Sequence, residues 1–341
     1  MLKNNKIFKT SDLQKLDKYT IENEPVTSLD LMERAATVFT EKLLIFFPNS
    51  HIFNILAGSG NNGGDGYVVA RLLCQNGLNV KVFGLHENDH LSPDCAVNRE
   101  RFINMGGCYI EVKNPDNLQP DENSVLVDAI FGAGLNRPVT GFLGDIIRRI
   151  NGLSHPVVAI DMPSGLMGED NGENNGAIIK ADYTFTFQFP KLAFMFPENV
   201  VYVGHWEVLD IRLHPVILRE YPAAYYYLTE EVVASRLLIP EKFSHKGTLG
   251  NTLLIVGSYS MMGAAVLAAK GAIRSGTGLL SVHVPRKLKE MIHLSVPEAL
   301  VEVDRNEFCF SGVDNLSRFQ AVGIGSGIGT SPVTAEGIRQ L

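Results

Sequence analysis

The stretch ILAGSGNNGGDGYVVARLL, residues 55–73, passes from a short apolar run through a glycine-rich segment into an amphipathic one. This order is typical of a β-strand, a tight loop and a helix. The backbone N–H groups that open a helix have no partner within it and lie at the positive end of its dipole. The stretch therefore predicts a binding site for a phosphate group where the helix begins.

Apolar runs and amphipathic segments alternate on both sides of this stretch. Ser11 and Gln14 have the spacing of a capping box, so one helix is expected to begin there and a second one after Ser28. Strands are expected at residues 52–57, 80–83, 125–129, 157–160, 183–189 and 206–209, with helices near 66–76, 93–105 and 141–151. This alternation predicts an α/β, Rossmann-like domain of three layers with a mostly parallel sheet.

The segment 213–250 interrupts the alternation with three prolines and a cluster of tyrosines, which is typical of a linker. The alternation then resumes with NTLLIVGS (251–258), GAAVLAAKGAIRSG (263–276), LLSVHVP (279–285) and AVGIGSGIGTSP (321–332). We therefore expect two domains, residues 1–217 and residues 218–341, and the second is expected to be the beginning of another α/β domain.

Length and composition narrow the class of protein. The chain has 341 residues, a formal net charge of −7 and 45% hydrophobic residues. Its acidic balance argues against nucleic acid as a partner. No apolar run reaches the roughly 18 residues that cross a bilayer, and no apolar signal-peptide segment follows the basic N-terminus. We expect a cytoplasmic protein with neither a membrane nor a nucleic-acid partner.

The four cysteines give no sign of a metal or redox site. Cys74, Cys95, Cys108 and Cys309 show no CxxC spacing and have no histidine cluster beside them. Free cysteines are among the most buried residue types. We therefore expect buried, reduced thiols.

The glycine-rich stretch also permits a second interpretation. Gly58, Gly60 and Gly63 match the G-x-G-x-x-G pattern of dinucleotide-dependent oxidoreductases, with Glu87 or Asp89 as the acidic residue for the ribose. Asp65 argues against it, because a carboxylate would meet a pyrophosphate that rests on the helix. Asp65 could equally be an ordinary N-cap of the helix.

Five segments in order resemble NAD(P)H-hydrate epimerases. They are LMERAA (31–36), NNGGDG (61–66), VDAIFGAGL (127–135), AIDMPSGL (159–166) and FPKLAF (189–194). Later segments, among them HKGTLGNTLLIVGS (245–258) and GIGSGIG (323–329), resemble the beginning of the ADP-dependent NAD(P)H-hydrate dehydratases, which have a ribokinase-like fold. The chain is thus similar to bifunctional NAD(P)H-hydrate repair enzymes, which join the two.

The resemblance implies a set of binding residues. The substrate would be NAD(P)H hydrate, a reduced nicotinamide dinucleotide with water added at carbon 6 of its ring. Implied substrate contacts are Asn61, Asn62, Gly63, Gly64, Asp65, Gly132, Ala133, Gly134, Leu135, Asn136, Arg137, Pro138 and Asp161, with Ala265 (or its neighbour Ala264) and Gly327 in the dehydratase part. A potassium ion would be held by Asn62, Asp128 and Ser164, whose oxygens suit a hard cation.

Asp161 is the candidate catalytic residue. It follows a predicted strand, and inversion at the hydrated carbon requires a group that moves a proton near the hydroxyl. Lys191, which follows a predicted strand, is a candidate electrostatic helper of the site; the favoured interpretation is a solvent-exposed lysine, because lysine is rarely buried without a partner.

The second half implies further co-reactants. Its complete form would use ADP and magnesium to recover NAD(P)H from the S form of the hydrate, and the later motifs of that family are expected beyond residue 341 or absent. A homo-oligomer is also expected. A non-catalytic binding module on the epimerase fold remains a third hypothesis besides the enzyme and the oxidoreductase.

Overall fold

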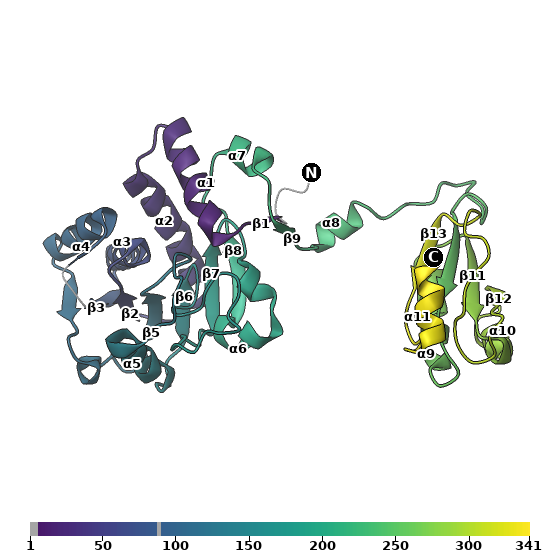
Figure 1. The fold of residues 1–341 in the computed structure, drawn as a ribbon. Coiled ribbons are helices and arrows are strands. Elements are labelled where there is room, and N and C mark those ends of the chain that lie inside the picture. Colours follow the sequence, from purple (N-terminus) through teal and green to yellow (C-terminus); the bar gives the residue numbers. More distant parts are fainter. Residues whose placement is uncertain (1–5, 87–89) are drawn as a thin grey trace. The chain divides into compact units, whose positions relative to one another are not determined.

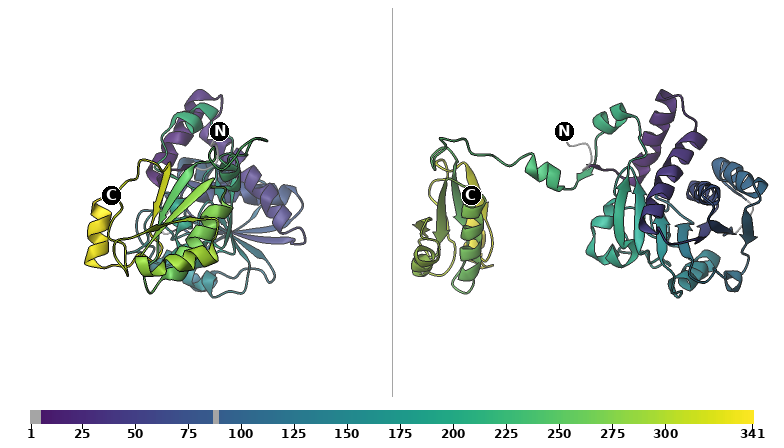
Figure 2. Two further views of the ribbon diagram at one scale, coloured as in Figure 1. Left: turned by 90° about the vertical axis from the view of Figure 1, so that its right-hand side faces the viewer. Right: turned by 180° about the vertical axis from the view of Figure 1, so that it is seen from behind.

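The computed structural model describes residues 6–86 and 90–341 (Figure 1; Figure 2). Contacts divide the chain into two compact units, Met1–Ser235 and Arg236–Leu341. Residues 218–235 therefore go with the first unit, where β9 (Tyr225–Tyr226) pairs antiparallel with β1 (Lys6–Ile7). The units divide after Ser235, later than the boundary expected after residue 217.

A seven-stranded sheet forms the middle layer of the first unit (Figure 1). Its order is β4-β3-β2-β5-β6-β7-β8, and all neighbours are parallel. The strands are β2 (Ile52–Ala57), β3 (Asn79–Gly84), β4 (Cys108–Glu111), β5 (Val125–Ala129), β6 (Val157–Ile160), β7 (Tyr183–Phe187) and β8 (His205–Leu209). The central strands β5 and β6 are buried throughout, as parallel strands covered on both faces are. The expected α/β class is confirmed.

Helices cover both faces of this sheet (Figure 1). On one face lie α2 (Ser28–Phe46), α3 (Asn61–Gln75) and α4 (Pro93–Asn104), which share a core with Phe53 and Val127. On the other lies α5 (Gly141–Asn151), which packs on Leu126. The remaining helices are α1 (Thr10–Asn23), which packs against α2, and the short α6 (Val200–Val203), α7 (Pro215–Glu220) and α8 (Glu230–Ala234), with 3₁₀ turns at Pro115–Asn117, Leu192–Met195 and Pro197–Asn199.

The strand order places a ligand site at one edge of the sheet. From β2 the chain proceeds to β3 and β4 on one side, and then crosses back to β5 and β6 on the other. Such a change of direction leaves a crevice outside the carboxyl ends of the two middle strands, where α/β proteins bind ligands. The starts of α3 and of the loop after β5 both lie at this edge.

Three local predictions are corrected by the structure. α3 begins at Asn61 rather than near residue 66, so Asp65 lies in its second turn and is not an N-cap. Ser11 and Gln14 form no capping box, because α1 begins at Thr10; the box belongs to Thr27 and Asp30 at the start of α2. The sequence prediction also missed β4, a partly exposed edge strand without a clear apolar pattern.

The cysteines are free thiols, but they are not all buried. Cys95 is buried in the core of α2, α3 and α4, whereas Cys108 is exposed at the start of β4. The expectation was wrong for Cys108 because an edge strand is covered only in part.

The second unit is built on a four-stranded parallel sheet of order β12-β11-β10-β13. Its strands are β10 (Asn251–Ile255), β11 (Leu279–Val284), β12 (Leu300–Val303) and β13 (Ala321–Ile324), and its helices are α9 (Met262–Arg274), α10 (Lys289–Ser295) and α11 (Pro332–Arg339), with a 3₁₀ turn at Arg286–Leu288. α9 and α10 share a core with β11. The expected second α/β unit is present.

Candidate active site

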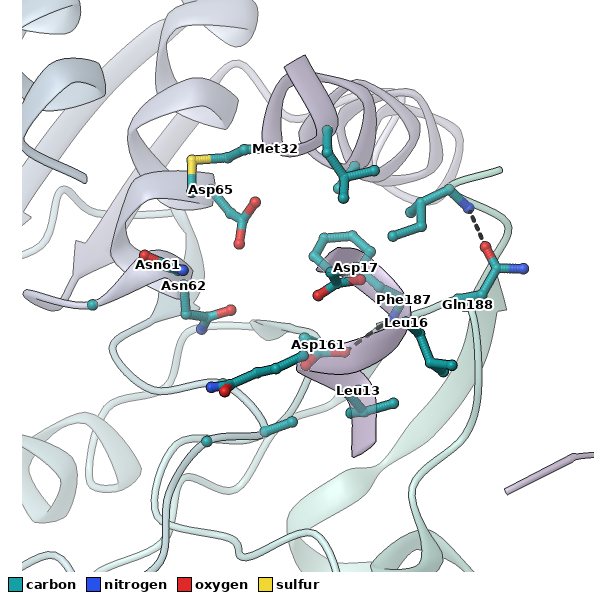
Figure 3. A pocket seen from close by; sticks show the side chains of 18 of the residues that line it. Leu13, Leu16, Asp17, Met32, Asn61, Asn62, Asp65, Asp161, Phe187 and Gln188 are labelled. Carbon is teal, nitrogen blue, oxygen red and sulfur yellow. Dashed lines mark hydrogen bonds between the residues drawn. The ribbon is translucent and has the colours of Figure 1, made fainter. Parts of the chain in front are cut away.

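A cavity of about 450 Å³ opens at the carboxyl edge of the first sheet (Figure 3). Its walls come from α1, α2, the first turns of α3, the loop after β5, the end of β6 and the loop after β7. Apolar side chains, including those of Leu13, Leu16, Met32 and Phe187, make one part of the wall. The charged part consists of Asp17, Asp65, Asp94, Asp161 and Lys191. The cavity can therefore take a flat ring that carries polar groups.

Asp161 follows β6 directly and has a strained backbone. Its φ of +64° lies in the left-handed region, which a residue other than glycine adopts at a cost. Its Oδ1 accepts hydrogen bonds from Lys191 Nζ at 2.6 Å, from the Phe187 N–H at 3.1 Å and from the Thr186 hydroxyl at 3.1 Å. Within the described chain all hydrogen bonds to this carboxylate end on Oδ1. Oδ2 is thus left for a ligand in the cavity.

Lys191 is buried, and the expectation of a solvent-exposed lysine was wrong. Its side chain is only 2% exposed, and its ammonium also donates to the Thr186 hydroxyl at 2.8 Å and to the Phe189 carbonyl at 3.2 Å. These acceptors supply the partners that a buried ammonium needs. Lys191 therefore orients Asp161 and neutralises charge in the cavity.

Two further carboxyl groups point into the same space as Asp161 (Figure 3). Burial raises the pKa of Asp17 to about 6; the charge of Asp161 adds to this rise, and Lys191 opposes it. Burial also raises the pKa of Asp65 well above its usual value, with added effects of Asp161, Asp17 and Asp94. Carboxylates that crowd one site cannot all ionise. The cavity therefore favours the protonated forms of Asp17 and Asp65 more than water does.

The three residues expected to bind potassium lie around the loop after β5. The buried Asp128 accepts hydrogen bonds from the Ser164 N–H at 2.7 Å, the Ser164 hydroxyl at 2.5 Å and the Ile130 N–H at 3.2 Å. Burial raises the pKa of Asp128 to about 6, although these hydrogen bonds oppose the rise. The Asn62 Oδ1 lies 3.2 Å from the point where a Cβ on Gly132 would stand. Asn62 Nδ2 is buried and has no hydrogen-bond partner within the described chain.

A second cavity, of about 510 Å³, adjoins the first. Both are lined by Ile130 and Phe131, and the second also by Gly58, Ser59 and Arg137. Arg137 is exposed and is the charged residue among those that line the second cavity. The two cavities together offer one acidic and one basic compartment.

Packing requires most of the glycines of the opening stretch. A Cβ on Gly58 would stand 2.1 Å from the Ile130 carbonyl oxygen, and one on Gly63 would stand 2.0 Å from the Gly58 oxygen. A Cβ on Gly64 would meet the side chain of Met32 at 2.8 Å. Packing thus accounts for Gly58 and Gly63 of the G-x-G-x-x-G match without a dinucleotide, whereas a Cβ on Gly60 would meet no atom within 4 Å. The ribose candidates of the oxidoreductase hypothesis, Glu87 and Asp89, lie outside the described residues.

The comparisons with known proteins agree with this geometry. Residues 28–193 match the family model "YjeF-related protein N-terminus", and residues 252–340 match "NAD(P)H-hydrate dehydratase". A bifunctional NAD(P)H-hydrate repair enzyme of Moorella thermoacetica is 32% identical over 348 residues, which cover 97% of this chain and 65% of the relative. The chain belongs to the NAD(P)H-hydrate repair family.

Other relatives in the NAD(P)H-hydrate repair family are equally distant. One from Synechocystis is 32% identical over 336 residues, covering 95% of this chain and 62% of the relative. The chain thus spans somewhat less than two thirds of the length of these curated relatives. A yeast protein of known crystal structure, YNL200c, shares the fold of the first unit: its TM-score is 0.50 at 22% identity, over 60% of this chain and 88% of that one.

The structure brings most of the residues implied by the family resemblance to the two cavities. Asn61, Asn62, Asp65, Gly132, Ala133, Gly134 and Asp161 line the first, and Leu135, Arg137 and Pro138 line the second. Asn136 is exposed, while Gly63 and Gly64 are buried in the packing of α3.

Among the described residues, no helix combines the length and the apolar character that a membrane span requires.

In the second unit, whose residues 252–340 match the NAD(P)H-hydrate dehydratase family model, the two implied residues lie near the start of α9. Ala265 is fully buried and faces Gly257. Gly327 has a φ of +76°, and a Cβ on it would stand 3.1 Å from the Ala264 Cβ. Ala264, which is only partly buried, is therefore the alanine beside Gly327.

The sequence prediction missed Asp17 as a member of the site. Leu13, Leu16 and Asp17 line the cavity from one face of α1, with helical spacing of three and four residues. A carboxylate within an apolar stripe was the available signal. Only the contact of α1 with the rest of the unit shows that this stripe borders a cavity.

Proposed function

We propose that the first unit interconverts the R and S forms of NAD(P)H hydrate. The single observation that carries the proposal is Asp161, whose Oδ1 is held by three donors while Oδ2 is left to a ligand in an acidic, partly apolar cavity. The curated relatives, named as bifunctional repair enzymes for this hydrate, support it.

The residues of the first cavity would act on the hydrated ring. Leu13, Met32 and Phe187 would pack against its flat, apolar part. Asp161 Oδ2 would exchange a proton with the oxygen at carbon 6, as a general acid–base group within hydrogen-bond reach does. Lys191 would keep the carboxylate in place during that exchange.

The second cavity would take the phosphates of the dinucleotide. Arg137 supplies a positive charge beside Gly58 and Ser59, and guanidinium groups bind phosphate through paired hydrogen bonds. The first cavity holds carboxylates and would repel phosphates. This difference in charge would place the ring of the substrate in the first cavity and its phosphates in the second.

We further propose that Asn62, Asp128 and Ser164 hold a potassium ion. Their side chains offer an amide, a carboxylate and a hydroxyl oxygen, and no hydrogen bond within the described chain ends on the Asn62 Oδ1. When bound, the ion would supply a positive charge that fixes the loop after β5. An ion that binds only the folded state raises stability by mass action.

Thermal unfolding in different salts tests the potassium site. The unfolding midpoint should be higher in potassium chloride than in lithium chloride of the same ionic strength. Asp128→Ala should remove this difference, whereas Asp145→Asn, which changes an exposed carboxylate on α5, should keep it. Equal midpoints of the unchanged protein in both salts would contradict the site.

Chromatographic separation of the two hydrates tests the main proposal. The purified S form should be converted to the equilibrium mixture faster with the protein than without it, and no nucleotide should be consumed. Asp161→Asn should slow this conversion roughly 10²–10⁴-fold, the usual contribution of an acid–base group. A folded, unchanged protein that gives only the spontaneous rate would refute the proposal.

For the second unit we propose dehydration of the S hydrate, with ADP and magnesium as co-reactants of the complete dehydratase domain. The match of residues 252–340 to that family model supports this proposal. The test uses a protein that spans the whole length of the relatives. Recovery of reduced nicotinamide absorbance from S hydrate should require ADP, and recovery without ADP would contradict the proposal.

A further inference from the structure

Asp17 is a partly buried carboxyl group to which the proposed function assigns no task. It lies on α1, outside the segment 28–193 that matches the first family model. Its side chain lines the same cavity as Asp161 and points into it from another element (Figure 3). Within the described chain its carboxylate takes part in no hydrogen bond or ion pair of the kind that holds Asp161. Its carboxyl oxygens are thus available to a ligand.

Inversion at carbon 6 requires two proton transfers at different places. The hydroxyl on one face of the ring must leave as water, so its oxygen has to gain a proton. A new water must add to the opposite face and lose a proton. One carboxyl group fixed on one side of the ring cannot serve both faces, just as an inverting glycosidase needs two carboxyl groups for its two faces.

We propose that Asp17 is a second catalytic residue, which exchanges a proton with the oxygen on one face of the hydrated ring while Asp161 does so on the other. This inference rests on the proposed epimerase function. It deepens that function, because it states which two groups share the reaction and from which elements they come. The ring would then lie between α1 and the carboxyl end of β6.

The reaction balances without an added reagent. Asp17 gives its proton to the hydroxyl oxygen, the C6–O bond breaks, and its electron pair leaves with water. The lone pair of the ring nitrogen forms a double bond to carbon 6. Water then adds to the other face, where its oxygen forms the new bond and its proton passes to Asp161 Oδ2. Solvent returns the proton from Asp161 to Asp17 before the next turnover.

The charged groups around Asp17 support this division of tasks. Asp161 and Lys191 from the sheet edge and Asp65 from α3 face it, and Asp94 lies beside Asp65 in the same wall. Burial and the charge of Asp161 raise the pKa of Asp17 to about 6, against the effect of Lys191. Asp17 must carry its proton when it acts as the acid, so kcat/KM in that direction of the reaction should fall above about pH 6.

The pH dependence of Asp17→Asn tests the inference. We expect this substitution to lower kcat roughly 10²–10⁴-fold with little change of KM, and to abolish the decline of activity above about pH 6. The matched control is Glu22→Gln, which removes an exposed charge from the same helix and should leave rate and pH profile unchanged. An Asp17→Asn enzyme with the normal rate and profile would overturn the inference.

A stability measurement separates this role from a structural one. Folding raises the pKa of Asp17 from 3.8 to about 6, so the folded state binds more protons than the unfolded state between these values. Its ionised carboxylate therefore costs stability above about pH 6, and protonation removes this cost below about pH 4. Asp17→Asn should raise the unfolding midpoint at pH 8 and leave it nearly unchanged at pH 4. A lower midpoint at pH 8 together with lost activity would indicate a structural role and refute the inference.

Isotope exchange in the unchanged protein gives an independent test. In water enriched in ¹⁸O, each conversion should place one ¹⁸O atom at carbon 6, because the original oxygen leaves as water. Epimerisation without ¹⁸O uptake would overturn the two-carboxyl inference and leave the proposed function intact. Absence of epimerisation above the spontaneous rate would instead refute the proposed function itself.

Discussion

Lys191 places a positive charge where hardly any water reaches it. The ammonium is surrounded by the Asp161 carboxylate, the Thr186 hydroxyl and backbone carbonyls. A buried ion pair gains little net stability, because both ions lose their water, but the loss of one partner leaves the other charge uncompensated. We therefore expect the removal of one partner to cost much more stability than the intact pair contributes.

Lys191→Met should strongly destabilise the protein. We expect a loss of about 3–5 kcal/mol in the free energy of unfolding, the usual effect of removing one partner of a buried ion pair. Urea denaturation at neutral pH measures it. Lys113→Met, which changes a lysine that is 79% exposed, is the control and should alter this free energy by less than about 1 kcal/mol. Equal effects of both substitutions would mean that Lys191 reaches solvent.

At the scale of the element, the beginning of α1 is held by Glu169, a residue far from it in the sequence. Its N-cap, Lys9, offers no side-chain cap. The Glu169 carboxylate accepts the Thr10 N–H at 2.6 Å and the Thr10 hydroxyl at 3.0 Å instead. This carboxylate satisfies an unpaired donor and interacts favourably with the helix dipole. α1 carries Asp17, so the cap also supports the site.

Glu169→Ala should loosen the beginning of α1. The expected loss is about 1 kcal/mol in the free energy of unfolding, as for other lost caps. Glu173→Ala, at an exposed position in the same loop, should have almost no effect. Amide hydrogen exchange would locate the change: residues at the start of α1 should exchange faster in Glu169→Ala, and unchanged protection there would refute the cap.

At the scale of the whole molecule, the two units are joined by an exposed segment. Leu237, Leu238, Ile239 and Phe243 are 65–86% exposed. Residues 236–250 contain no helix or strand. A segment with so few contacts is expected to open locally at little cost in free energy. Each unit has its own sheet and core, so each can remain folded when the segment is cut.

Limited digestion with trypsin should cut this segment first. Arg236, Lys242 and Lys246 are exposed there and offer three cleavage sites. Mass spectrometry should find a stable N-terminal fragment that ends at one of them, and this fragment should keep the epimerase activity. Lys180, exposed within the first unit, is the internal comparison and should be cut later. First cleavage near residue 217 would instead support the boundary expected from the sequence.

The sequence predicted the α/β class and the positions of most strands along the chain, and the family resemblance implied part of the lining of the first cavity. Strand and helix periodicity is local and can be seen in the sequence. The family resemblance implied that Asn62, Asp128 and Asp161 belong to one site, which agrees with the meeting of the carboxyl ends of parallel strands at one edge. The ends of the helices were harder to predict from the sequence. The start of α3 at Asn61 depends on the close packing of Gly63 against Gly58, which the local pattern does not contain.

Only the tertiary structure decided which side chains meet across long stretches of chain. Lys191 pairs with Asp161, thirty residues away, and Glu169 caps Thr10 across 159 residues. Asp17 belongs to the cavity because α1 packs against α2 and borders the carboxyl edge of the sheet. Burial and the charges of neighbouring elements set the properties of these groups. The physical reason is that a residue's own segment fixes its local conformation, whereas its solvation and its partners depend on the elements packed against it.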